Sequence, residues 1–377
     1  MINILRKILK KYLIPALIIS VLVLLTIKLN SIQKTELVGC GGHSFEKGVV
    51  TEIEEDNIQQ DGSRVGEQQI KVKMKSGLRK GEELGATSSS GFLFGAPCTV
   101  GMHVIVIQSV AGDSTVTSIY SKDRGGIIII FAVMYLLLLC IIGGRQGARG
   151  AIGLIFTFAS IIYVYLPMIY LGFSPFATAV FICIITTIIT LYLVGGPTIK
   201  TLVATTGTIA GVCMAGLIAT LFSRASGITG FNVSDIESLL TLWETNDIQV
   251  GGLLFSGLLI STLGAVMDVA MSISSSMSEL CVQNPGIERI ELFKAGMRVG
   301  RDMMGTDSNT LILAFAGSSL SMMVMNYAYD LPFLQIINSN NIGIAVMQGL
   351  SGSFGVVLSV PSTVMMFTWI REWKKTR

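Results

Sequence analysis

Long apolar stretches separated by short polar loops run through most of the chain. Residues 127–144, for example, contain no charged side chain. A helix needs about 20 apolar residues to cross a bilayer, where a backbone must satisfy its own hydrogen bonds. The pattern therefore predicts an all-α multipass transmembrane bundle of about eight helices, with spans near residues 12–27, 126–143, 151–171, 176–194, 198–222, 250–271, 309–327 and 342–370.

A polar block at residues 30–124 follows the first predicted helix. Its segments 47–53, 69–74 and 102–110 alternate or cluster apolar residues as strands do, and turn-forming residues separate them. We expect a small β-rich domain here, OB-like or lipoyl-like. The predicted domains are an N-terminus with an anchor helix at 1–29, the β-rich domain at 30–124, and a domain of about seven transmembrane helices at 125–377.

The first apolar stretch also has the composition of a signal peptide, because basic residues precede it. Leu37–Cys40 resembles the cleavage site of a lipoprotein signal. That site should follow the apolar run directly, but Lys28, Asn30, Lys34 and Glu36 lie between them. An uncleaved anchor is the preferred interpretation.

The basic residues predict the orientation. If the N-terminus is cytoplasmic, the short outer loops hold only Arg224, whereas the inner loops and the tail hold Arg145, Arg149, Lys200, Arg289, Lys294, Arg298, Arg301, Arg371, Lys374, Lys375 and Arg377. Because Lys and Arg are enriched in cytoplasmic loops, we expect both termini inside and the β-rich domain outside.

Composition narrows the function. The chain is 51% hydrophobic and only 14% charged, against about 25% charged in soluble domains. A net charge of +3 gives no reason to expect a nucleic-acid partner. The sequence has no phosphate-binding Gly-x4-Gly-Lys-Ser/Thr loop and no His-Glu-x-x-His motif, and no predicted span contains histidine. We therefore expect neither an enzyme nor a cofactor.

Asp268 lies within the sixth predicted span. At helical spacing it belongs to a small or polar stripe that comprises Ser261, Gly264, Asp268, Ser272, Ser275 and Glu279. A carboxylate near the bilayer centre is costly, so such residues face a cavity or a partner and mark functional sites. We expect this stripe to line a wet cavity or a tight helix seam. The alternatives are that Asp268 reaches cytoplasmic water or forms a packing hydrogen bond.

Residues 287–305 alternate apolar and basic residues at helical spacing, which predicts a helix lying on the cytoplasmic interface. Asp302, Thr306 and Asn309 then share one face of the helix that enters the seventh span. Arg301 is a candidate countercharge for Asp268 or Asp302.

Small residues and helix breakers mark two other spans. Gly207, Gly211, Ala215 and Ala219 form a row in the fifth span, which predicts a close helix-packing seam. In the eighth span Gly352, Gly355 and Pro361 predict a helix break that would expose backbone polar groups for ion or solute binding. An ordinary proline kink is the alternative there.

The predicted outer domain contains Cys40, His43, Cys98 and His103, which include both histidines of the chain. Two close Cys/His pairs are the pattern that zinc prefers. Cys40 and Cys98 could instead form a disulfide outside the cytoplasm. A third alternative is that these residues are not linked.

Residues 264–273 and 300–314 together resemble the signature of the YibE/F-like family of bacterial multipass membrane proteins. The similarity extends from about residue 125 to the C-terminus. The resemblance implies a protein of the bacterial plasma membrane but supplies no reaction. The residues that match the family motifs are Gly264, Asp268, Gly300, Arg301, Asp302, Gly305, Thr306 and Asn309, whereas Asp307 departs from the less polar residue expected there.

Buried polarity without hydrolytic machinery favours a permease or secondary transporter of an unknown small solute or ion. Asp268 would couple transport to a proton or cation, Arg301 and Asp302 would gate the cytoplasmic side, and Thr306 and Asn309 would coordinate the solute. The competing hypothesis is a non-transporting envelope sensor, assembly factor or scaffold. The expected partners are the lipid bilayer, the solute, and either a second copy of the chain or an envelope protein.

Overall fold

A computed structural model describes residues 26–31, 43–59, 64–89, 95–111, 114–233, 236–237, 239–241 and 248–375. The chain divides into two compact units, one formed by Lys34–Leu138 and the other by the rest. Almost all of the predicted first span, and also Cys40, lie outside the described residues.

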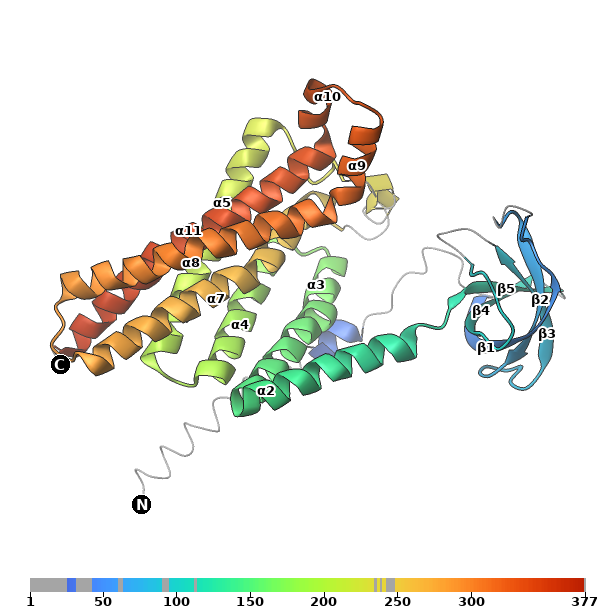
Figure 1. The fold of residues 1–377 in the computed structure, drawn as a ribbon, viewed down its shortest axis with the longest axis horizontal. Coiled ribbons are helices and arrows are strands. Elements are labelled where there is room, and N and C mark those ends of the chain that lie inside the picture. Colours follow the sequence, from blue (N-terminus) through green and yellow to red (C-terminus); the bar gives the residue numbers. More distant parts are fainter. Residues whose placement is uncertain are drawn as a thin grey trace, which may run out of the picture. The chain divides into compact units, whose positions relative to one another are not determined.

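The smaller unit contains a closed barrel of five strands, β1 (His43–Glu55), β2 (Glu67–Met74), β3 (Glu83–Ser89), β4 (His103–Ala111) and β5 (Ser114–Lys122), in the order β1-β2-β3-β5-β4 (Figure 1). Neighbouring strands are antiparallel except for β3 and β5, which are parallel. This five-stranded Greek-key barrel agrees with the OB-like alternative. The β-rich character of this segment is therefore confirmed.

Alternation of buried and exposed side chains builds the barrel core. Along β2, Gln68, Ile70, Val72 and Met74 are buried while the residues between them are at least partly exposed. Gln68 is the polar member of this row, and it is satisfied because its Oε1 accepts from the Cys98 N–H at 2.7 Å and its Nε2 donates to Asp56 at 2.9 Å. The buried amide thus ties two loops to the core.

Helices form the larger unit. They are α2 (Gly125–Ser160, which begins in the smaller unit), a π-helical turn η1 (Ile161–Tyr165), α3 (Leu166–Tyr170), α4 (Pro175–Gly195), α5 (Ile199–Ser226), a 3₁₀ turn η2 (Val250–Gly252), α7 (Leu253–Gln283), α8 (Arg289–Ser318), α9 (Leu320–Ala328), α10 (Phe333–Ile337) and α11 (Asn340–Lys375). Within the described residues, five helices are long and apolar enough to cross a membrane, or six if α8 and α9 count as one bent span.

The helical segment Gly125–Tyr170 contains a sharp kink near its centre. Its 46 residues would extend about 69 Å as a straight helix, roughly twice the hydrocarbon thickness. Gly144 has φ 53° and ψ −132°, which is not helical, and a Cβ on Gly147 would lie 2.0 Å from the Leu139 carbonyl oxygen. The two glycines therefore permit a sharp break, and it falls at the loop predicted after residue 143.

A seam of small residues joins α5 to α11, and it confirms the packing role predicted for Gly207 and Gly211. A Cβ on Gly207 would lie 2.0 Å from Thr363 Oγ1, and one on Gly211 would lie 2.8 Å from Ser359 Cβ. Gly355 of α11 approaches the Gly211 carbonyl oxygen in the same way, at 2.9 Å. Glycine lets the two backbones approach closely, so van der Waals contact replaces side-chain volume.

Two expectations concern helix boundaries. The helix predicted at residues 287–305 is confirmed, because α8 runs without a break from Arg289 to Ser318 and the bend of 59° comes only at α9; its place at the membrane interface stays a prediction. The predicted break at Gly352, Gly355 and Pro361 is absent, because α11 is helical throughout. Gly352 and Gly355 are packing residues, a Cβ on Gly352 lying 2.4 Å from Thr262 Cγ2, and the alternative of proline within a helix holds.

Replacing Gly211 by Ala should destabilise the protein. The new methyl group would have to displace Ser359 and the Gly355 backbone, and overpacking of this kind costs about 1–3 kcal/mol. Gly150→Ala is the matched control, since no atom lies within 4 Å of its Cβ position. Thermal unfolding of the full chain in detergent should show a lower midpoint for Gly211→Ala alone. Equal midpoints for both variants would contradict the seam.

Asp123 should make the stability of the smaller unit depend on pH. The Lys47 ammonium group at 3.0 Å, and then the Gly125 N–H at 3.1 Å, hold the pKa of this carboxyl below its ordinary value of 3.8. Its contribution is therefore complete above pH 3.8 and is lost as the pH falls through the lower folded-state pKa.

The test compares the unfolding free energies of the wild type and Asp123→Asn between pH 7 and pH 2. The stability difference should be present at neutral pH and disappear in acid, and Lys47→Met should remove most of it. A difference that stays constant over this range would show that the carboxylate charge plays no part.

Candidate functional site

Asp268 is the central residue of α7, which comprises the 31 residues Leu253–Gln283. At 1.5 Å per residue, about 22 Å of helix extends on either side of it. The helix has the two faces that its periodicity predicts. Leu263, Val266 and Ile273 are buried, whereas Asp268 is exposed.

The polar stripe of α7 lies on the outer surface of the chain. Ser261, Gly264, Asp268 and Glu279 are exposed, and Ser272 and Ser275 are partly exposed. Among the described residues, the stripe therefore lines neither the wet cavity nor the tight helix seam that the sequence predicted. A void of about 10 Å³ between α4, α5 and α7 is lined by apolar side chains and threonine, and it does not include Asp268.

Asp307 of α8 is the nearest acidic neighbour that acts on Asp268, and the two carboxylates repel each other electrostatically. They come from antiparallel neighbouring helices, α7 and α8, that are joined by the short loop Asn284–Glu288. Sequence reasoning treated Asp307 only as a departure from the family motif. A signal for their proximity was available in the sequence. Asp307 follows the Asn284–Glu288 loop by about as many residues as Asp268 precedes it, which sets the two at similar heights on antiparallel helices.

The remaining motif residues of α8 divide between two faces. Arg301, Asp302, Gly305, Thr306 and Asn309 are exposed. Gly300 is buried instead, and a Cβ there would lie 2.2 Å from Val360 Cγ1 of α11. Gly300 thus lets α8 approach α11 and is a packing residue.

Arg301 is not paired with Asp268 or Asp302 in this structure. The ion pairs among the described residues involve other side chains, and Asp268, Arg301, Asp302 and Asp307 take part in none of them. These three acids and one base therefore have no ion-pair partner in the described part of the chain.

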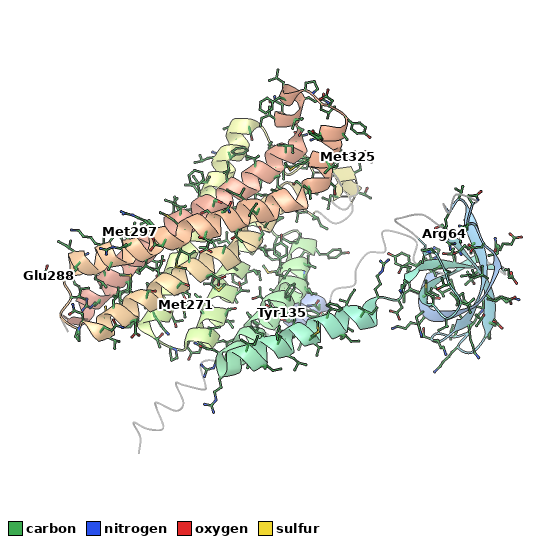
Figure 2. All side chains as sticks on the ribbon, viewed as in Figure 1. Arg64, Tyr135, Met271, Glu288, Met297 and Met325 are labelled. Carbon is green, nitrogen blue, oxygen red and sulfur yellow. The ribbon has the colours of Figure 1, made fainter. Side chains whose placement is uncertain are left out.

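Side chains next to the stripe hold α7 in place. Met271, labelled in Figure 2, follows Asp268 by one turn, and its Cε would lie 2.8 Å from a Cβ on Gly195 at the end of α4. The Ser274 hydroxyl donates to the Lys200 carbonyl oxygen at 2.6 Å, which ties α7 to the start of α5. These contacts position Asp268 on a rigid element.

The described members of the Cys/His set are not brought together. Cys98 is fully buried and its Sγ lies 3.3 Å from the Ala96 carbonyl oxygen. Both histidines are exposed. On β1, His43 pairs with Ser109 and Val49 pairs with His103, so the two histidines are about 20 Å apart at 3.3 Å per residue. Within the described residues, no group of three or more His, Cys, Asp or Glu could hold a metal ion.

Cys98 should be a poor nucleophile and a poor metal ligand. Burial raises the pKa of its thiol, and the thiolate is the reactive form. In a variant that retains Cys98 as its sole cysteine, maleimide labelling should be at least about tenfold slower in the folded protein than in detergent-unfolded protein. Equal rates, or a Cys40–Cys98 disulfide found in the wild type by mass spectrometry, would contradict this assignment.

Comparison with known proteins separates the helical part of the chain from the barrel. A family model described as YibE/F-like protein matches residues 131–373, which include Asp268, Asp307 and both motif segments. The match excludes the barrel. No curated protein matches the chain, and no solved structure does. Because the family model covers more than half of the sequence, the chain belongs to the YibE/F-like family.

Proposed function

We propose that the protein is a permease or secondary transporter of the bacterial cytoplasmic membrane that carries an unknown small solute or ion, with Asp268 as its coupling carboxylate. The apolar helices and the family membership are compatible with a membrane protein. The polar face around Asp268, at the centre of a long apolar helix, is the observation that carries the proposal.

The proposed topology has about eight spans. Dividing Gly125–Tyr170 at Gly144 turns one long segment into two of spanning length. These two, with α4, α5, α7, the bent α8–α9 pair, α11 and the anchor expected at residues 12–27, make about eight.

Both termini are proposed to be cytoplasmic, and contacts at one end of the bundle support this arrangement. Arg289 at the start of α8 bonds Glu372 near the end of α11 at 2.7 Å, and Arg371 donates to the Pro285 carbonyl oxygen at 2.8 Å. Lys200 lies on the same side, because its carbonyl accepts from Ser274. Basic residues therefore gather at the end that the positive-inside rule assigns to the cytoplasm.

The proposed coupling chemistry follows from the two carboxylates. Two acids that repel each other favour binding of a proton or a cation between them. The bound positive charge removes the repulsion and so lowers the free energy of the pair. In the proposed mechanism Asp268 and Asp307 share that ion. Thr306 and Asn309, beside Asp307 on α8, supply hydroxyl and amide groups to the solute.

Arg301 and Asp302 are proposed as the cytoplasmic gate. They lie one and a half turns before Asp307, which places them about 9 Å closer to the cytoplasmic end of α8. Charged side chains at this level would control access of water and ions to the acids above them. Movement of these two side chains is the step expected to alternate access.

The alternative is a non-transporting envelope sensor, assembly factor or scaffold. The exposed polar residues around Asp268 favour this hypothesis, because another membrane protein could bind over them. In that case the carboxylates would hold protein to protein, and neutralising one of them would weaken assembly without changing any flux.

Asp268→Asn tests the proposal in proteoliposomes, with uptake assayed for a panel of inorganic cations and small metabolites and with a pH-sensitive dye inside. The wild type should transport at least one of them. Asp268→Asn should reduce that flux by at least about tenfold, because an uncharged amide neither takes up a proton nor supplies the negative charge that attracts a cation.

Glu279→Gln is the matched control, since Glu279 lies on the same stripe near the end of α7 and should retain flux. Asp307→Asn should share the defect of Asp268→Asn. Flux that is unchanged in Asp268→Asn, or absent from the wild type across the whole panel, would reject the coupling role.

A further inference from the structure

A cavity of about 630 Å³ lies in the smaller unit, where β5 leads into α2. Its lining comes from β1, from the loop before β4, from the adjoining ends of β4 and β5, and from the first turns of α2. Ligand pockets commonly have volumes of about 300–1,000 Å³, so a lipid headgroup fits here. We infer that this cavity binds the headgroup of an anionic phospholipid, with Lys122 and His103 contacting the phosphate.

Backbone hydrogen bonds hold the lining of the cavity in place. The Val50 N–H of β1 donates to the Met102 carbonyl oxygen at 3.0 Å, and the Gly101 N–H donates to the Val50 carbonyl oxygen at 2.8 Å. The loop before β4 is thereby tied to β1. The Asp123 N–H donates to the His103 carbonyl oxygen at 3.0 Å, which ties the end of β5 to the start of β4. Lys122 and His103 therefore line one cavity from two paired strands.

The cavity carries more positive than negative charge. Asp123 is the only acid among the residues that line it, all of which are described, and its carboxylate already accepts from Lys47 at 3.0 Å and from the Gly125 N–H at 3.1 Å. Lys122 and His103 are exposed, and neither side chain has an ion pair or a hydrogen bond within the described residues. The Lys122 ammonium group and a ring N–H of His103 are thus free to donate to an anion.

Part of the lining is apolar and continues along α2. Ile127 and Ile130, which are neighbours on one side of this helix, are 53% and 65% exposed, and Val100 of the loop before β4 is 65% exposed. No charged residue occurs between Arg124 and Arg145. The cavity therefore lies at the polar end of the candidate membrane-spanning segment Gly125–Tyr170. With α2 in a bilayer, that end is at the depth of the lipid headgroups.

This combination selects a phospholipid over a soluble anion. A soluble anion would bind Lys122 but leave the two isoleucines in water, whereas a phospholipid brings a phosphate to the lysine and an acyl chain to the isoleucines. The one lysine that Asp123 does not neutralise matches the single negative charge of a phosphodiester. A zwitterionic lipid would add an ammonium group that Lys122 repels. Basic pockets beside membrane helices bind anionic headgroups in this way.

The inference requires that α2 enters a membrane, but it does not depend on transport. Asp268 and the helices that carry the proposed flux lie in the larger unit, and none of their residues lines the cavity. Lipid binding and flux can therefore be lost independently.

Native mass spectrometry of the full chain in detergent tests the site by titration with phosphatidylglycerol and, separately, with phosphatidylcholine. The wild type should bind phosphatidylglycerol more tightly. The double variant His103→Gln with Lys122→Gln should weaken phosphatidylglycerol binding at least about fivefold and leave phosphatidylcholine binding unchanged, because it removes the donors to the phosphate. Lys80→Gln is the matched control, since Lys80 is exposed, lies outside the cavity and carries the same charge as Lys122.

Thermal unfolding in the same detergent supplies a second readout. Without lipid, the double variant should melt at the wild-type temperature, because neither side chain has a partner to lose within the described residues. Phosphatidylglycerol should raise the midpoint of the wild type and of Lys80→Gln, since a ligand that binds the folded state stabilises it. It should raise the midpoint of the double variant less.

Equal affinity of the wild type and the double variant for phosphatidylglycerol would overturn the inference, as would equal weakening by Lys80→Gln. Glycerol phosphate and inorganic phosphate are the competitors that separate the two sources of a phosphate group. Displacement of the lipid by either one at a similar concentration would assign the cavity to a soluble anion and overturn the lipid assignment. Failure of both to compete, with the loss confined to the double variant, would support it.

Discussion

Close approach of α5 and α11 at Gly207, Gly211 and Gly355 is the contact on which the helical unit depends. In lipid, helices gain little from burying apolar surface against each other, so contact at short range must supply the attraction. Buried polar side chains of the core also find hydrogen-bond partners within it. Thr208, Thr262 and Thr363 are buried, and each hydroxyl donates to a carbonyl one turn earlier in its own helix.

Hydrogen bonds and ion pairs among the described residues stabilise the barrel. Gln68 joins the Cys98 backbone to Asp56 through buried hydrogen bonds, and Arg64 bonds the same Asp56 carboxylate at 2.6 Å. At the other end Asp123 links β1 to the first turn of α2 through Lys47 and Gly125. Polar networks inside and at the rim thus hold a small core, and a change in the barrel would be passed to α2 through this link.

The sequence predicts where the helices lie better than it predicts which elements pack against them. Hydropathy locates α4, α5 and α11 to within about five residues and also the start of α7, which continues to Gln283, well beyond the predicted residue 271, and periodicity separates the two faces of α7 correctly. It cannot say what covers each face, so the stripe around Asp268 was expected inside the chain. Gly352, Gly355 and Pro361 were interpreted as breakers because propensity ignores tertiary contact, yet α11 is helical throughout, with Gly352 packed against Thr262 and the Ser362 hydroxyl donating to the Leu358 carbonyl oxygen. The register of β1 against β4 separates His43 from His103, and the sequence spacing of the Cys/His residues does not reveal that register.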